Sequence, residues 1–273
     1  MCDVLDAKKA GFYAWLKRQP SAREMRDRDL RVKIVAIHKE NRKRYGSPRI
    51  HAKLRQLNER CGRKRVARLM RAENIRIKRR KAFVPKTTDS KHEFPIAGNL
   101  VERRFSPGEI GGPNRCWAGD ITYIWTGEGW LYLAVVIDLF SRMVIGWSMS
   151  SSMHTRFVLD AFNMAIGRRG VPKNLIWHSD RGVQYASAAM RSLLKAYAIR
   201  CSMSGKGDCW DNAVVESFWS TLKGEIFGDG NPPRREIARA AIFDFIEIWY
   251  NRERIHSTLG YVTPEQFELK AVA

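Results

Sequence analysis

The distribution of charge along the chain is the feature that most restricts its architecture. Residues 1–100 contain 29 Lys and Arg but only 10 Asp and Glu, a net charge of +19, whereas residues 101–273 contain 20 and 18 and are almost neutral. Excess positive charge confined to one third of a chain is typical of a nucleic-acid-binding module joined to a nearly neutral domain. We therefore expect two domains with different tasks.

Composition argues against several other classes of protein. The sequence has no run of 18 apolar residues that could cross a membrane, and its first residues lack the basic-then-apolar layout of a signal peptide. We therefore expect a cytoplasmic protein with no membrane partner. The five cysteines form no CxxC pair and do not stand at zinc-finger spacing with a histidine, which predicts reduced thiols and no structural zinc.

Helical patterns fill the basic N-terminal region. Charged and apolar residues mix as in a helix over 29–41, and two shorter helices are predicted at 48–58 and 63–73 with Gly62 in the turn between them. Two short helices joined by a glycine-containing turn, the second strongly basic, are typical of a helix-turn-helix. A small helical bundle with a solvated basic face is the alternative, but the localised charge favours DNA contact.

Basic side chains on the last two of these helices are the candidates for that contact. In the helix at 63–73, Val66, Leu69 and Met70 are expected to point inward, which leaves the basic residues for the outer face. The candidate DNA-binding residues of the region are Arg49, Lys53, Arg63, Lys64, Arg65 and Arg68.

From Cys116 onward the pattern changes to short strands. Segments 117–125, 131–138 and 143–149 are separated by turns and predict an antiparallel meander. The elements expected after it are a helix at 155–168, a strand at 174–179, a helix at 186–198, a strand at 199–203 and a helix at 211–225. A meander followed by alternating helix and strand predicts an α/β fold, a mixed sheet with helices on its faces.

Three domain segments follow from these patterns. The helical DNA-binding region is placed at 1–81, and a linker with four prolines and no periodicity at 82–113. The α/β domain is placed at 114–273 and includes a C-terminal helical extension.

Three acidic residues of the α/β domain are candidates for metal binding. Asp120 interrupts an apolar and aromatic strand, Asp180 closes an apolar strand, and Glu216 lies among apolar residues of a helix. Each alone has an ordinary explanation: an ion pair for Asp120, a turn for Asp180, a solvated helix face for Glu216. As a set separated by 59 and 35 residues, they favour a site for Mg²⁺ or Mn²⁺, because carboxylates converging without a cation repel one another.

The motifs around these carboxylates resemble those of one family. The matching stretches are Trp117 with Asp120–Tyr123, Tyr132–Arg142, His178–Tyr185, Asp211–Phe218 and Tyr250–Pro264. At these residues the chain resembles retroviral-integrase-like DDE transposases, in particular the OrfB-type transposase of bacterial insertion sequence family three. The resemblance implies an RNase H-like integrase catalytic core behind an N-terminal all-α helix-turn-helix domain. The zinc-binding head of retroviral integrases is absent, as the cysteine pattern indicates.

The resemblance also implies roles for individual residues. Asp120, Asp180 and Glu216 become the catalytic and metal-binding triad, with two ions of Mg²⁺ or Mn²⁺. Lys223, seven residues after Glu216 and therefore able to share its helix face, matches a basic position that contacts DNA. Asn212, one turn before Glu216, is expected to contact a DNA strand without being catalytic. Asp138 is expected to be structural.

The implied function is metal-dependent cleavage and strand transfer of DNA by a bacterial, nucleoid-associated transposase. Its expected partners are the DNA ends of the element, target DNA, further copies of the chain, and the element's first-reading-frame product, separate or fused by frameshifting. A metal-dependent nuclease of the same fold and a non-catalytic DNA-binding regulator are the alternatives. Only a transposase would yield joined DNA product.

Overall fold

The chain forms two compact units, in line with the two domains expected from the change in charge and periodicity. One compact unit is Met1–Ile77 and the other is Lys78–Ala273. The computed structural model describes residues 8–77, 94–205, 209–228 and 230–272. No helix in these ranges is long and apolar enough to span a membrane. The domain limits at 81 and 113 stay predictions, and residues 78–81 lie outside the described part.

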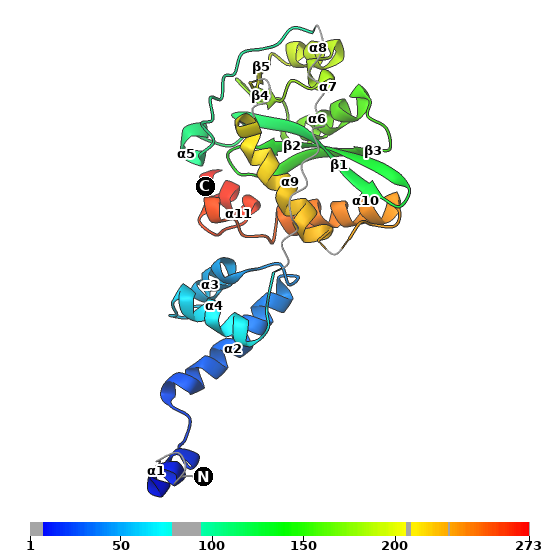
Figure 1. Ribbon diagram of the computed structural model, residues 1–273. Helices are drawn as coiled ribbons and strands as arrows, with labels where there is room; N and C mark the ends of the chain where they lie inside the picture. The colour runs from blue at the N-terminus through cyan, green and yellow to red at the C-terminus, as the bar shows by residue number, and fades with distance from the viewer. Residues whose placement is uncertain (1–7, 78–93, 206–208, 229, 273) are drawn as a thin grey trace. The chain divides into compact units, whose positions relative to one another are not determined.

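The N-terminal unit contains a bundle of three helices, α2 (Ala22–Glu40), α3 (Ser47–Gln56) and α4 (Arg63–Ala72), which contact one another (Figure 1). A short helix, α1 (Lys9–Leu16), precedes them and buries no residue. Helix α2 begins seven residues before the predicted helix, because Ser21 caps it and Glu24 completes the capping box.

The core of the bundle consists of aliphatic residues repeated at helical spacing. Ile34, Ile50, Leu54 and Val66 are fully buried. The inward orientation expected for Val66, Leu69 and Met70 is observed. Helix α3 ends at Gln56, two residues before the predicted end, so that Leu57 is already the C-cap and is 61% exposed.

One buried acid joins two helices of the bundle. Asp27 of α2 accepts hydrogen bonds from Arg65 Nε at 2.7 Å and from Arg68 Nη2 at 2.6 Å, and both arginines lie on α4. These bonds, that of Arg68 first, lower the pKa of Asp27. Arg65 and Arg68 therefore hold α4 against α2, a use that the prediction of DNA-contacting side chains did not include.

Asp27→Asn is expected to lower the thermal unfolding midpoint of the N-terminal unit by several degrees at pH 7. Because the folded-state pKa is lowered, the stability due to Asp27 is present above about pH 3.9, the unfolded value, and is lost as the pH falls through the folded value. The difference between wild type and variant should therefore shrink at low pH. The loss of stability is also measured as faster hydrogen exchange of the backbone amides of α4. Asp29→Asn, an exposed change on α2, is the control. Equal protection in both variants at pH 7 would contradict the role of Asp27.

The second unit is organised around one five-stranded sheet. Its strands are β1 (Cys116–Thr126), β2 (Gly129–Asp138), β3 (Val144–Ser150), β4 (Ile176–Ser179) and β5 (Arg200–Met203). Their order is β3-β2-β1-β4-β5, with antiparallel pairing from β1 to β3 and parallel pairing of β1 with β4 and β4 with β5 (Figure 1). The predicted antiparallel meander and mixed sheet are confirmed.

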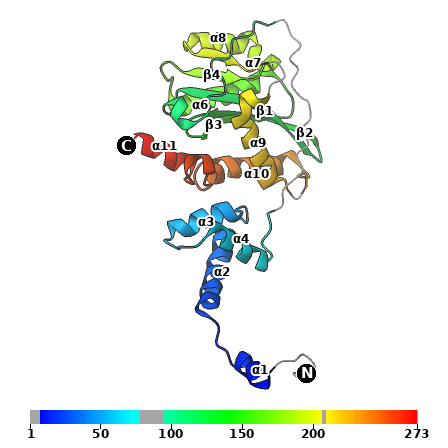
Figure 2. The ribbon, with the colours of Figure 1, turned by 60° about the vertical axis from the view of Figure 1, so that its left-hand side comes forward.

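Helices cover both faces of the sheet (Figures 1 and 2). Helix α6 (Thr155–Arg169) packs on the face that carries Trp117 and Val136, and a side chain at Gly146 would collide with the backbone of α6. Helix α9 (Ala213–Ile226) contacts β1 from the opposite face. The remaining elements are α5 (Pro107–Ile110), α7 (Val183–Ala186), α8 (Ala188–Ala196), η1 (Cys209–Asn212), α10 (Arg235–Phe243), η2 (Asp244–Tyr250), η3 (Ser257–Leu259) and α11 (Pro264–Val272).

Two predicted segments differ from the structure. The helix expected at 186–198 is the shorter α8, which begins at Ala188 because Ser187 caps it, and the short helix α7 that ends at Ala186 was not predicted. The segment expected to be a linker is in part attached to the second unit: Leu100 N donates to Ser202 Oγ at 2.9 Å, and α5 forms within it. Residues 82–93 lie outside the described residues.

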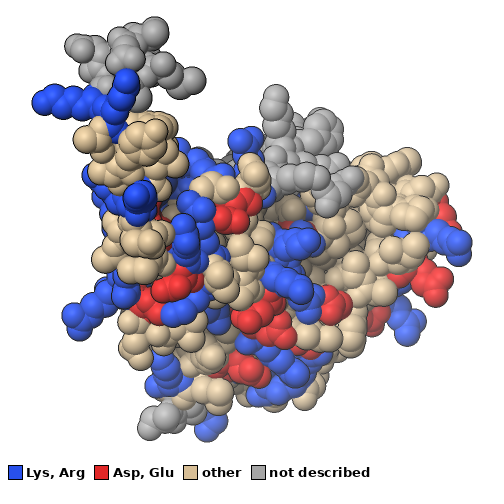
Figure 3. Space-filling view, turned by 90° about the horizontal axis from the view of Figure 1, so that it is seen from below, with Lys and Arg blue, Asp and Glu red and all other residues tan. Residues whose placement is uncertain are grey.

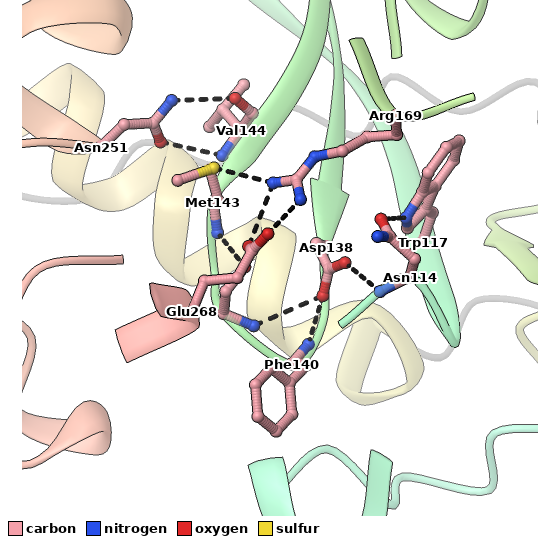
Figure 4. A network of polar contacts seen from close by, with 10 residues as sticks. Asn114, Trp117, Asp138, Phe140, Met143, Val144, Arg169, Asn251 and Glu268 are labelled. Atoms are coloured by element: carbon pink, nitrogen blue, oxygen red, sulfur yellow. Dashed lines mark hydrogen bonds and ion pairs between the residues drawn. The ribbon is translucent and has the colours of Figure 1, made fainter. Parts of the chain in front are cut away.

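Asp138 lies at the turn between β2 and β3, where it has a structural role. Its buried carboxylate accepts hydrogen bonds from the backbone N–H groups of Asn114 at 2.7 Å and Phe140 at 2.8 Å (Figure 4). Burial raises the pKa of Asp138 to about 6. Nearby, Arg169 pairs with Glu268 of α11 and so ties the C-terminal helix to α6.

The outer edge of the sheet is contacted by the C-terminal helical region. Asn251 accepts a hydrogen bond from Val144 N at 3.0 Å and donates one to Val144 O at 2.9 Å, so that its amide pairs with the edge strand β3 (Figure 4). Further along β3, Arg239 Nη1 donates to Met149 O at 3.1 Å.

Candidate active site

The parallel pairing of β1 with β4 brings two of the three acids together. Gly119 and Ser179 are opposite each other in this pair, so Asp120 on β1 and Asp180, which directly follows β4, occupy the next positions. Gly119 has to be a glycine, because a Cβ there would overlap the ring of Trp177 and press on Tyr185. The pairing of β1 with β4 therefore sets the spacing of Asp120 and Asp180, and Trp177 packs closely against Gly119 beside them.

The environment of Asp120 opposes its ionisation. Burial and then the neighbouring Asp180 raise the pKa of Asp120 well above its usual value, and Glu216 adds to the effect. A hydrogen bond from Trp219 Nε1 to Asp120 Oδ2 at 2.7 Å acts in the opposite direction. Burial followed by Asp120 and Asp180 also raises the pKa of Tyr185. The negative charges of these acids thus repel one another, as expected of neighbouring carboxylates.

Glu216 joins this group from α9. Burial raises its pKa, Lys223 lowers it, and Asp180 raises it further. Lys223 thus lies close enough to act on Glu216, in agreement with the expectation that positions two turns apart share a helix face. In the ranges that the structure describes, no three His, Cys, Asp or Glu side chains are arranged closely enough to hold a metal ion.

Asn212 is buried, whereas a contact with a DNA strand would need an exposed side chain. Its side chain is 5% exposed, and its Nδ2 reaches the backbone oxygen of Gly119 at 3.5 Å. This places Asn212 between the start of α9 and the strand that carries Asp120. The geometry favours a structural role over the expected contact with a DNA strand.

A buried network at the start of α9 was not predicted. His178 donates from Nε2 to the backbone oxygen of Asp211 at 2.7 Å, while its Nδ1 lies 2.9 Å from Ser202 Oγ. The Asp211 carboxylate accepts from Gly205 N and from Arg103 Nε, both at 2.8 Å. Gly205 and then Arg103 lower the pKa of Asp211, and burial lowers that of His178. The network joins the strand of Asp180 to the helix of Glu216.

The candidate DNA contacts of the N-terminal unit differ in exposure. Arg63 and Lys64, at the start of α4, are exposed. Arg49 lies over the ring of Tyr45, with its guanidinium carbon 5.7 Å from the ring centroid, and Lys53 is half-buried. Arg65 and Arg68 are paired with Asp27. On the face shown in Figure 3, Lys and Arg side chains are interspersed with acidic ones.

Comparison with known families assigns both units to classes. The model of an integrase core domain matches residues 111–209, and a second integrase core domain model matches residues 197–264. The model of an HTH-like domain matches residues 24–83. The chain thus combines an integrase core with a helix-turn-helix-like domain, and the predicted fold class is confirmed.

Curated relatives define the family itself. Transposase InsF of insertion sequence IS3A from Escherichia coli strain K12 is 45% identical over 275 residues, which cover 100% of this chain and 94% of the relative. A 31 kDa protein of insertion element IS600 from Shigella sonnei is 38% identical over 99% of this chain and 98% of its own length. The chain belongs to the family of IS3 transposases, enzymes of the polynucleotidyl transferase type that act on DNA.

Two solved structures resemble the chain at lower similarity. The integrase catalytic core domain of HTLV-2 in complex with magnesium is 22% identical, with a TM-score of 0.45 over 58% of this chain and 98% of that one. An intasome of simian T-cell lymphotropic virus is 22% identical, with a TM-score of 0.48 over 80% of this chain and 73% of that one.

Proposed function

We propose that Asp120, Asp180 and Glu216 are the catalytic carboxylates of this transposase and that together they bind Mg²⁺ or Mn²⁺, as two ions. One observation supports this proposal above all: Asp120 and Asp180 directly follow paired residues of adjacent parallel strands. Together with Glu216, these two acids shift one another's pKa. Such a site suits a transposase, because metal ions can activate the attacking oxygen and stabilise the leaving oxygen when a phosphodiester is cleaved and rejoined.

The chemistry of the three side chains fits a divalent ion of this kind. All three offer carboxylate oxygens, which suit Mg²⁺ and Mn²⁺. The burial and mutual repulsion that raise the pKa of Asp120 would be relieved by a cation among the acids. Coordination by all three would require their side chains to close around the ion. When bound, the ions would activate the attacking oxygen and stabilise the leaving oxygen of a phosphodiester.

Other side chains have supporting tasks in this proposal. Lys223, close to Glu216, is suited to attract a phosphate of the DNA strand toward the carboxylates. Arg63 and Lys64 contact DNA phosphates from the exposed start of α4, and Arg49 and Lys53 extend this surface. Arg65 and Arg68 contribute mainly by holding α4 in place. We further propose that the enzyme acts as a homo-multimer on two element ends, with or fused to the first-reading-frame product.

The test uses a labelled oligonucleotide that ends in a 3′-OH at the element terminus, a target plasmid, and the chain with and without Mg²⁺. Joined product that depends on Mg²⁺ is expected. Hydrolysis without joined product would instead support a nuclease, and DNA binding with neither product would support a non-catalytic regulator. The assay is repeated with the chain fused to the first-frame product, because that partner could be needed for recognition of the ends.

A further inference from the structure

One side chain outside the acidic group makes direct contact with it. The indole Nε1–H of Trp219 donates to Asp120 Oδ2 at 2.7 Å. Trp219 is only 5% exposed, and its ring centroid lies 5.0 Å from that of Phe218. An indole has a single N–H donor and no acceptor, so this bond uses all of its hydrogen-bonding capacity. A bond from a fixed ring to a carboxylate restricts the orientation of that carboxylate.

The position of Trp219 on the chain gives the contact its importance. Trp219 and Asp120 are 99 residues apart in sequence, and they connect α9 with β1. Glu216 lies on the same helix, three residues before Trp219, and side chains at this spacing lie on neighbouring positions of one helix face. A single rigid helix therefore carries one acid of the group and the donor that holds another.

We propose that Trp219 is a positioning residue that orients the Asp120 carboxylate for divalent-metal binding. The inference rests on the proposed function, since it takes Asp120 as a metal ligand. Partners that hydrogen-bond to metal ligands fix the orientation of the ligands, and their loss typically weakens metal affinity about 10- to 100-fold. Trp219 donates such a hydrogen bond to Asp120, and it lies on the same helix as Glu216.

A purely structural role makes a different prediction. A buried indole N–H needs an acceptor, and Asp120 could serve only to satisfy it. In that case removal of the N–H would change the stability of the protein without changing its affinity for metal. Metal affinity measured directly, apart from activity, therefore separates the two roles.

The experiment compares Trp219→Phe with Trp147→Phe in the full chain. Trp147 on the edge strand β3 is a matched control, because its Nε1 donates to the carboxylate of Glu247 at 2.6 Å and β2 separates it from β1, which carries Asp120. Each variant loses one indole-to-carboxylate bond and keeps an aromatic ring. Mn²⁺ binding is measured by calorimetry without DNA, and the Mn²⁺ midpoint for strand cleavage is measured in parallel.

Trp219→Phe is expected to weaken Mn²⁺ binding about tenfold and to raise the cleavage midpoint to the same extent, whereas Trp147→Phe stays within about twofold of wild type. Equal Mn²⁺ affinity in the two variants would overturn the proposal. If Trp219→Phe does not fold, site-specific 3-benzothienylalanine at 219 keeps the ring shape and removes only the N–H, and the same two outcomes apply.

Asp120→Asn separates this inference from the proposed function. If Asp120→Asn binds Mn²⁺ and joins strands like wild type, Asp120 is not a ligand and the proposed function fails with the inference. If Asp120→Asn loses both properties while Trp219→Phe retains wild-type affinity, only the positioning role of Trp219 is rejected.

Discussion

Asp120→Asn is expected to abolish strand cleavage and strand transfer while making the metal-free protein more stable at neutral pH. Burial, Asp180 and Glu216 raise the pKa of Asp120 well above its unfolded value. A carboxyl group whose pKa is raised on folding contributes its full stability at pH values below its pKa in the unfolded chain. That contribution is lost as the pH rises through its pKa in the folded protein. A neutral amide avoids the loss and can still accept the bond from Trp219.

The loss of activity should be large. A metal ion supplies several kcal/mol of transition-state stabilisation, and its loss corresponds to a rate decrease on the order of 10³-fold or more. Asp180→Asn and Glu216→Gln are expected to have the same effect on activity. DNA affinity in a gel-shift titration should stay unchanged, because the DNA contacts are proposed mainly for the N-terminal unit.

The control for these variants is Asp160→Asn, an exposed acid on α6. It makes the same chemical change outside the acidic group and should alter neither rate nor unfolding midpoint. Retained strand transfer by any of the three site variants would reject the assignment of that residue. A lower unfolding midpoint for Asp120→Asn would show that its carboxylate stabilises the metal-free fold, contrary to the electrostatic argument.

Reversing the charges of Arg63 and Lys64 to Glu is expected to weaken DNA binding by roughly 10- to 100-fold at physiological salt. Each phosphate contact contributes about 0.9 to the slope of log affinity against log salt concentration, so the slope should fall in magnitude by about 2. Both side chains are exposed at the start of α4. Arg65 is left unchanged, because reversing it would also break its ion pair with Asp27.

Lys173→Glu with Lys195→Glu is the control for this double variant. These two side chains are exposed on the second unit, and their reversal changes the net charge by the same amount. A general electrostatic effect would reduce affinity equally in both double variants. That result would remove α4 as the DNA-contacting helix.

The sheet could be predicted from sequence because its signal is local. Segments 117–125, 131–138 and 143–149 alternate or run apolar between clear turns, and the structure has strands there within a few residues. Asp120 and Asp180 could be singled out because each interrupts or ends an apolar strand. The cap at Ser187 and the short helix α7 before it were missed, since a serine near the start of a helical pattern also fits the helix itself.

The contacts around the acids could not be predicted in the same way. The bond between Trp219 and Asp120 joins residues 99 positions apart, and that between His178 and the backbone of Asp211 spans 33 positions. Both depend on tertiary packing. Trp219 reads as an ordinary buried aromatic residue of an amphipathic helix. Arg65 and Arg68 read as outward basic residues for a related reason: Asp27 lies about 40 positions earlier.

The pairing of Asn251 with Val144 has a consequence for association between copies of the protein. An uncovered edge strand offers unpaired backbone groups that recruit strands from other chains and lead to aggregation. Here a side-chain amide takes the place of the missing strand at Val144, and Arg239 occupies the carbonyl of Met149. At these two positions β3 therefore offers no free backbone group to a strand of a second copy.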